Sequence, residues 1–459
     1  MSKLFGRLAT LAMLSGCSFM PAFERPVLPV PTQWPQLLQP AGERSRAGLS
    51  WQQILPDPRL QALIEAALEH NRDLRIAVAR VEESRALYGI ASADRLPTVS
   101  GSASQNASRM PGDLSATGQR LISRRFDLSL GVTAFELDFW GRVKSLSEAS
   151  KASYLASEEA RDAFRLSLIS DVANIYLTLQ ELEERLILAR STVDTRKESR
   201  FLVQKRRDVG LAGDLDFLAA DGAYEATRAE VANLERNRAQ ADHALTLLVG
   251  AVPEHLPPGR RLNEQGITLD IAVEAPSEVL LSRPDVRAAE QRLIAANANI
   301  GAARAAFLPR IGLSLAFGTA SRTLSGLFDA GSGAWNFTPT LVQPLFDADR
   351  TQANVDLAET RKIIAVAEYE KSIQQAFREV ADLLVARDKL AEQLTAQEAV
   401  VKAQNERLRL VDARYQSGIS NYLEVLDAQR DAFAAQQNSL QLRRILLASA
   451  IQLYKALGG

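Results

Sequence analysis

The apolar and polar positions of the chain predict a mainly helical protein whose helices are unusually long. Residues 142–209 and 347–416 contain neither glycine nor proline. At 1.5 Å per residue, each stretch would form a helix of roughly 100 Å. The core of an ordinary globular domain needs no helix of that length. We therefore expect extended helices that pack in pairs, as in coiled coils.

A glycine follows each long stretch and predicts a turn. The two turns consist of Val209, Gly210 and Leu211, and of Ser417, Gly418 and Ile419. Glycine adopts the left-handed backbone angles found just past a helix end. Asp214 fits the N-cap of a returning helix, and Asn421 with Glu424 fits a capping box. The sequence thus predicts two helical hairpins, over residues 142–250 and 347–457.

Residues 126–133 and 311–318 have the period-two alternation of strands that differ on their two sides. Residues 98–108 and 336–346 supply weaker partner strands. Pro339 and Pro344 weaken the fourth strand, because proline cannot donate to a ladder. We predict two β-hairpins, at about 98–140 and 310–346, whose connections are too long for tight turns and suit the outer loops of a membrane barrel.

The chain also contains an internal repeat. Residues 73–97 share ten identities with residues 285–309, among them Gly89 with Gly301. Further along, an offset of 208 aligns Gly210 with Gly418. A period of about 210 residues is far longer than a solenoid unit. We therefore predict a duplicated domain, with copies at 61–250 and 284–459 and a proline-rich connector at 251–283.

The N-terminus predicts secretion and lipid attachment. Lys3 and Arg7 precede a short apolar stretch, and small residues then lead to Cys17, the only cysteine of the chain. This order is typical of a signal peptide, here residues 1–16. A cysteine after small residues resembles the bacterial lipoprotein cleavage box, in which the thiol is acylated. The alternative is a chance thiol on a short amphipathic helix. Residues 17–60 are rich in proline and should run extended along a surface.

Composition argues against several classes of function. The net charge of −1 gives no global attraction to nucleic acid. No apolar stretch after the N-terminus is long enough for a transmembrane helix. The three histidines are scattered, and neither a metal-site spacing nor a phosphate-binding glycine loop occurs. We expect neither an enzyme nor a bound metal or cofactor.

The strand count predicts an oligomer. Four strands cannot close a barrel, and open sheet edges do not occur in lipid. Two chains would supply eight strands, which side chains would fill, whereas three would supply twelve and leave a passage. The expected fold is therefore mainly α with a transmembrane β part. It is a duplicated unit of long coiled-coil helical hairpins plus two β-hairpins, with four strands per chain in a twelve-stranded barrel shared by a trimer.

Several motifs resemble the TolC family of outer-membrane efflux proteins, and most closely its lipoprotein branch serving resistance-nodulation-division multidrug pumps. They are Glu-Leu-Asp-Phe-Trp-Gly-Arg-Val-Lys-Ser at 136–145, Leu-Ser-Arg-Pro-Asp at 281–285, Gly-Ala-Ala-Arg-Ala-Ala-Phe-Leu-Pro at 301–309 and Leu-Asp-Ala-Gln-Arg at 426–430. The resemblance implies a homotrimer, lipid-anchored in the outer membrane and extending into the periplasm. It implies a passive exit duct for antibiotics and other toxic small molecules, with a periplasmic adaptor and an inner-membrane pump as partners.

The resemblance also implies two sets of site residues. Leu423, Glu424 and Asp427 would line the constriction at the periplasmic mouth, and three-fold symmetry would gather their carboxylates around the axis. The two hairpin turns would contact the adaptor. The alternative for the acidic residues is that Glu424 caps its helix and Asp427 pairs with Arg430 on the surface.

Three other functions are compatible with part of the sequence. A duct for type I protein secretion shares the predicted architecture and differs in what it carries. A periplasmic spacer would not need alternating strands. A cytosolic coiled-coil scaffold would explain neither the strands nor the signal segment.

Overall fold

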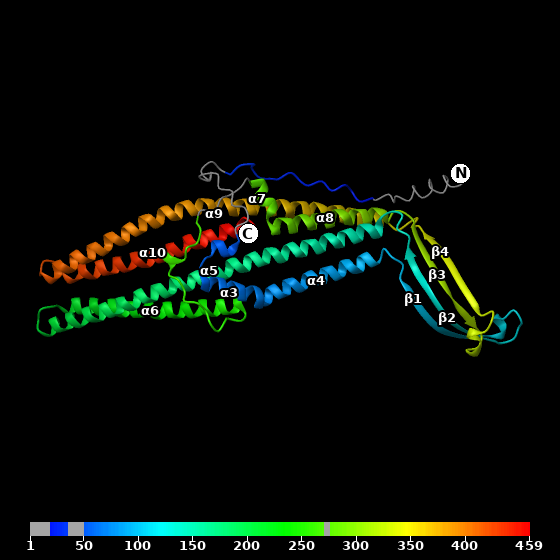
Figure 1. Cartoon of the computed structure of the whole chain (residues 1–459), viewed down its shortest axis with the longest axis horizontal. Helices are drawn as coiled ribbons and strands as arrows, with labels where there is room; N and C mark the ends of the chain where they lie inside the picture. The colour runs from blue at the N-terminus through cyan, green and yellow to red at the C-terminus, as the bar shows by residue number, and fades with distance from the viewer. Residues whose placement is uncertain (1–18, 35–49, 270–275) are drawn as a thin grey trace. The chain divides into compact units, whose positions relative to one another are not determined.

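The computed structural model describes residues 19–34, 50–269 and 276–459 (Figure 1). The predicted signal peptide and Cys17 lie outside these residues. The prediction that residues 17–60 run extended is wrong at its C-terminal end, because the short helices α2 (Trp51–Ile54) and α3 (Pro58–His70) begin there. Helix α4 (Arg72–Ala93) follows. The later short helices are α7 (Pro276–Ser282) and α8 (Pro284–Ala305). No helix in the described parts of the chain is both long and apolar enough to cross a membrane.

Four long helices form the two predicted hairpins. The first hairpin pairs α5 (Arg142–Asp208) with α6 (Asp214–Val249), and the second pairs α9 (Arg350–Gln416) with α10 (Tyr422–Ala456). Helices α5 and α9 have 67 residues each. The predicted hairpins are therefore confirmed, and the absence of glycine and proline explains why these helices are uninterrupted.

The start of the first returning helix differs from the prediction. Asp214 is the first helical residue of α6, and Gly213 holds the N-cap position instead. The backbone N–H of Gly213 donates to Asp216 Oδ2 at 3.3 Å. At the second start, Asn421 is the N-cap as predicted, and its Oδ1 accepts from the N–H of Glu424 at 2.9 Å. Asp216, the third residue of α6, thus accepts from the N–H of the N-cap residue, and the predicted role of Asp214 as N-cap is wrong.

The four strands form one antiparallel sheet in the order β1-β2-β3-β4. They are β1 (Val99–Met110), β2 (Leu121–Glu136), β3 (Arg310–Ser321) and β4 (Gly333–Val342). Two β-hairpins are present as predicted, and β2 also pairs with β3 across the two halves of the sequence. Strand β2 starts at Leu121, well before the expected 126. Pro339 lies within β4 opposite Leu313, on an edge strand where a missing donor is tolerated.

The chain divides into two compact units, each built from both halves of the sequence. One unit combines residues 19–27, 80–158 and 288–370, and contains the sheet. The other combines the described residues of 28–79, 159–287 and 371–459, which leaves out 35–49 and 270–275, and contains the largest apolar core. In that core, the Tyr176 hydroxyl donates to Asp57 Oδ2 at 2.7 Å. Burial is the main reason why the pKa of Tyr176 is raised well above its usual range.

The repeat is visible in a pair of matching contacts. Asn71 Nδ2 donates to the carbonyl of Leu248 at 2.8 Å. Arg283 Nη1 donates to the carbonyl of Ala456 at 2.9 Å. The sequence repeat aligns Asn71 with Arg283 and Leu248 with Ala456. Both side chains therefore satisfy a last-turn carbonyl of the returning helix, although the two residues are chemically different.

Residues 19–27, which follow the predicted lipid site, lie against α8. Asn297 Nδ2 donates to the carbonyl of Pro21 at 2.8 Å, and Arg25 Nε lies 2.7 Å from Glu290 Oε1. Met20 packs where Gly301 has no side chain: a Cβ there would lie 2.8 Å from Met20 Cα. This extended segment is thus held by named contacts along one helix.

Candidate functional site at the hairpin tips

The two hairpin turns have the same backbone. Gly210 has φ 76° and Gly418 has φ 75°, both in the left-handed region. After each glycine an N–H donates back into the helix, from Leu211 to the carbonyl of Arg206 at 2.8 Å and from Ile419 to that of Arg414 at 2.9 Å. This is the hydrogen-bond pattern that commonly ends a helix at glycine. Both glycines therefore serve first to end their helices.

The side chains around the first turn leave much apolar surface exposed. Val209 and Leu211 are 69% and 77% exposed, and Leu215 and Leu218 follow at 69% and 62%. Around the second turn, Ile419 is 69% exposed. Contiguous exposed apolar surface usually marks an interaction site. The predicted contact residues thus have the accessibility that docking requires.

A small buried cluster joins the two tips to each other. Val203 of α5 and Ala220 of α6 pack with Tyr422 and Val425 of α10. Burial raises the pKa of Tyr422 to about 12. Tyr415 adds a second tie, because its ring lies 5.5 Å from that of Tyr422 and its hydroxyl accepts from Arg206 Nη1 at 2.7 Å. The second tip is therefore held against the first through one face of α10.

The structure brings Leu423, Glu424 and Asp427 together on the opposite, exposed face of α10. Leu423 is 43% exposed, while Tyr422 and Val425 beside it are buried. Residues three and four apart share a helix face, so these side chains form one surface. Asp427 Oδ1 lies 3.1 Å from Arg430 Nη1, and both side chains are more than half exposed. The role of this surface as a pore constriction remains our proposal.

Sequence reasoning missed a partly buried ionic network that ties the hairpins together farther from the tips. Glu181 of α5, whose side chain is 6% exposed, contacts Arg185 at 3.0 Å and also Arg444 of α10. Arg185 also lies 3.4 Å from Glu230 of α6. One signal was available: Glu181 and Arg185 are four residues apart, which is the spacing of an ion pair along one helix. Because Glu181 is buried, removing its arginine partners would leave an uncompensated charge, which is strongly destabilising.

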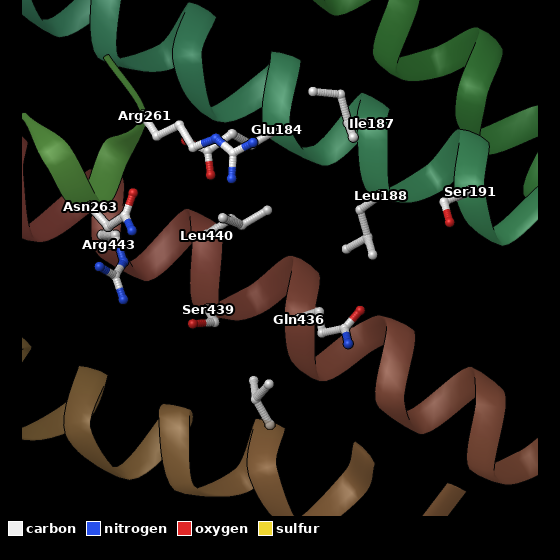
Figure 2. Close-up of a pocket in the computed structure, with 11 residues that line it drawn as sticks. Glu184, Ile187, Leu188, Ser191, Arg261, Asn263, Gln436, Ser439, Leu440 and Arg443 are labelled. Atoms are coloured by element: carbon white, nitrogen blue, oxygen red, sulfur yellow. The ribbon is translucent and has the colours of Figure 1, made fainter. Parts of the chain in front are cut away.

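A cavity of about 560 Å³ lies between α5 and α10, bordered by Arg261 and Asn263 of the connector (Figure 2). Two of its charged side chains are already engaged. Glu184 accepts from the N–H of Leu262 at 2.7 Å, and Arg443 pairs with Glu398. Across residues 19–34, 50–269 and 276–459, no group of three or more His, Cys, Asp or Glu side chains could hold a metal. The cavity thus offers space without an obvious reacting group.

The sheet has two chemically different faces. In register across three strands, Leu130 lies beside Phe317, and Phe317 lies beside Trp335. These three side chains are 59% to 74% exposed. On the other face Ser102 pairs with Ser129, and their hydroxyls are 2.9 Å apart. An exposed sheet with one apolar and one polar face is suited to separating lipid from water.

The sequence of this chain is also similar to a known protein family. A sequence model of the family described as "Outer membrane efflux protein" matches residues 63–251 and 275–459. The chain belongs to the outer membrane efflux protein family.

Curated relatives of this efflux protein match over nearly their whole length. The toluene efflux pump outer membrane protein TtgI of Pseudomonas putida is 43% identical over 455 residues, covering 98% of this chain and 96% of the relative. The outer membrane protein OprJ of Pseudomonas aeruginosa is 44% identical over 459 residues, covering 97% and 93%.

Solved structures share the fold of the efflux protein. The open state of the MtrE outer membrane channel of Neisseria gonorrhoeae has a TM-score of 0.88 at 39% identity, covering 96% of this chain and 98% of that one. A membrane protein from Pseudomonas aeruginosa has a TM-score of 0.89 at 42% identity, covering 96% and 100%. The long helical hairpins and the four-stranded sheet are therefore an arrangement that this family uses for a channel.

Proposed function

We propose that this efflux protein is one subunit of a homotrimeric, passive exit duct in the outer membrane. The duct carries antibiotics and other toxic small molecules from the periplasm to the outside. Relatives at 43–44% identity are an outer membrane protein of a toluene efflux pump and the outer membrane protein OprJ. The solved structure of MtrE is named as a channel. These names support efflux of small molecules over type I secretion of polypeptides.

The observation that carries the proposal is the two-faced sheet with two unpaired edges. Among the strands that the structure describes in one chain, β1 and β4 each pair on one side only. Unpaired backbone groups are costly in lipid, so both edges need partners. Three copies would supply twelve strands, pair every edge and enclose a passage lined by the serine-rich face. The apolar face would then meet the lipid.

We place the energy source in other proteins. Small molecules would move through the duct passively, driven by a resistance-nodulation-division pump in the inner membrane. A periplasmic adaptor would connect the two by docking on the exposed tip residues, namely Val209, Gly210, Leu211, Ser417, Gly418 and Ile419. The exposed apolar side chains at the tips support this assignment. No enzymatic step is proposed, and nucleic acid is not expected as a partner.

We propose that Leu423, Glu424 and Asp427 narrow the periplasmic mouth. Their common exposed face on α10 supports this role, because a residue that lines a pore cannot be packed against its own chain. Three copies of each carboxylate around one axis would attract cations. The pairing of Asp427 with Arg430 moderates this charge, but both groups remain open to solvent.

We propose that lipid on Cys17 anchors the chain to the outer membrane. The contacts that hold residues 19–27 along α8 would place this anchor at a fixed side of the protein. Cys17→Ala should abolish incorporation of labelled palmitate and leave the signal peptide uncleaved. Palmitate labelling of the Ala variant would contradict the assignment. Efflux should partly survive, because the membrane sheet also holds the protein in place.

The proposed function can be tested in cells that lack an exit duct but retain a matching pump and adaptor. Expression of this protein should lower the accumulation of a fluorescent pump substrate. The purified detergent complex should have the protein mass of three 50.2 kDa chains, less the signal peptides. Unchanged dye accumulation with the protein present in the outer membrane would refute the efflux role. Restored export of a polypeptide without any effect on dye would favour type I secretion.

A further inference from the structure

Gly301 and the small residues beside it on α8 form a close-packing site, here called the seat. In the structure, α5 of the same chain occupies this seat. A Cβ on Gly301 would lie 2.7 Å from Ser145 Oγ of α5, closer than side chains normally approach. The α8 residues one turn to either side, Ala298 and Ala305, are 1% and 2% exposed. Small residues thus allow α5 to approach α8 closely.

The part of α5 that faces this seat is a stripe of small residues. Ser145, Ala149, Ala152 and Ala156 recur at helical spacing, and each is at most 6% exposed. A second stripe on α5 faces its sequence neighbour α4, where Tyr154 stacks on Tyr88 with ring centroids 6.3 Å apart. Helix α5 therefore has two contact stripes, and both are used.

The repeat assigns α4 an equivalent seat, and that seat is empty. Gly301 aligns with Gly89, and Ala298 and Ala305 align with Ala86 and Ala93. All three α4 residues are exposed, and a Cβ on Gly89 would have nothing within 4 Å. The same small residues are thus buried on α8 and exposed on α4.

The repeat also identifies the stripe that should fill the seat. At the offset of 208, the α5 stripe aligns with Ala353, Leu357, Thr360 and Ile364 of α9. All four are exposed, with Leu357 and Ile364 at 46% and 52%. Val355, which aligns with Ser147, is 6% exposed and so belongs to the side of α9 that is already packed. Helix α9 therefore has one stripe in use and one without a partner.

We propose that the stripe Ala353–Leu357–Thr360–Ile364 of one copy packs on α4 of a neighbouring copy, with Ala353 seated at Gly89. This inference rests on the proposed oligomer and names its contact. Leu357 and Ile364 are larger than the alanines that they replace, and α4 has no equivalent of the Met20 that shares the Gly301 seat. Helix α4 leads into the edge strand β1 and α9 follows the edge strand β4, so one neighbour would complete both layers.

Cysteine cross-linking in outer membranes tests the contact directly. Gly89→Cys combined with Ala353→Cys should give oxidised dimers and trimers on a non-reducing gel. The matched control is Gly89→Cys with Asn354→Cys, because Asn354 is also exposed but points about 100° away around the helix. The control should cross-link at least several-fold less. Equal yields from both pairs would overturn the proposal.

A substitution in the seat provides a second readout that does not need cysteine. Gly89→Leu should lower the trimer fraction in detergent several-fold, because it fills the space intended for Ala353. Leucine favours a helix over glycine by about 1 kcal/mol, so a loss through misfolding of α4 is not expected. Trimers of normal mass and stability in this variant, with no cross-link between positions 89 and 353, would refute the seat and leave the duct intact. A wild-type protein that is monomeric by mass would refute both.

Discussion

The two hairpin tips have nearly the same backbone but very different side chains. Both long helices end at a glycine with φ near 75°, and both turns close with the same hydrogen bonds. The first tip exposes a run of valine and leucine residues. The second instead combines buried tyrosine with exposed acid on opposite faces of α10. A duplicated frame has thus acquired two different surfaces.

Aligned positions show where the tips diverge. Tyr422, Glu424 and Asp427 of the second tip align with Asp214, Asp216 and Ala219 of the first. Asp216 accepts from the N–H of Gly213, so the first tip uses this acid to start its helix. The second tip leaves Glu424 and Asp427 exposed. We infer that the two tips have different roles: the first mainly supplies an apolar docking surface, and the second supplies the constriction.

The largest expected change in conductance comes from opening the proposed constriction. Leu423→Ala with Asp427→Ala should raise single-channel conductance on the order of tenfold, which corresponds to a barrier lowered by about 1.4 kcal/mol. Smaller side chains leave a wider mouth, and the blocking cations lose a ligand. Cells should also become sensitive to large antibiotics. The measurement is conductance in planar bilayers together with growth inhibition.

The first tip supplies the matched control for that variant. Leu215 aligns with Leu423 and is 69% exposed, but it has no acidic residue one turn later. Leu215→Ala should leave conductance near the wild-type value. If both variants raised conductance equally, the two tips would share the constriction and the comparison would break down.

A smaller effect is expected from blocking the turns themselves. Gly210→Trp or Gly418→Trp should lower drug resistance several-fold while trimers reach the outer membrane in normal amount. Both positions face open space, so the indole would obstruct a docking partner. Left-handed angles cost other residues roughly 1 kcal/mol, and asparagine tolerates them better. Gly210→Asn and Gly418→Asn therefore serve as backbone controls. Full resistance in both Trp variants would argue against docking at the turns.

The smallest effect concerns the buried contact between the tips. Burial raises the pKa of Tyr422 to about 12, whereas in the unfolded chain it ionises near its ordinary value of about 10. The unfolded state therefore loses its proton first, and stability falls as the pH rises from about 10 to 12. Between pH 9 and 11, Tyr422→Phe should lose roughly 2 °C less in Tm than the wild type. Equal losses in Tm for both proteins would mean that folding does not raise the pKa of Tyr422.

Much of the helical part could be predicted because the residues that end the helices are recognisable from the local sequence. Gly210 and Gly418 end helices that contain no other breaker, and the structure ends α5 and α9 within two residues of them. The predicted start of β2 was wrong because the residues near Arg124 and Arg125 continue the hydrogen-bonded ladder without any apolar alternation. The prediction of Asp214 as an N-cap was wrong because Gly213 holds that position. Asp216 accepts from the N–H of Gly213.

The candidate site was predictable only as far as sequence neighbours define it. Asp427 is three residues from Glu424 and four from Leu423, so helical spacing alone predicts that the three share a helix face. The structure places them together. The contacts of Tyr422 with Val203 and of Glu181 with Arg444 join residues more than two hundred positions apart. Periodicity identifies the buried side of one helix but not which helix it meets. Such contacts require the fold.

The most direct test of the division between the tips is block by divalent cations in single-channel recordings. Cations added on the side of the hairpin tips should block the wild-type channel. Asp427→Ala should weaken that block on the order of a hundredfold, because a carboxylate and a charge about 6 Å apart interact by roughly 3 kcal/mol at an effective dielectric near 20. A side-independent block, or a block unchanged in Asp427→Ala, would place the constriction elsewhere and contradict the account.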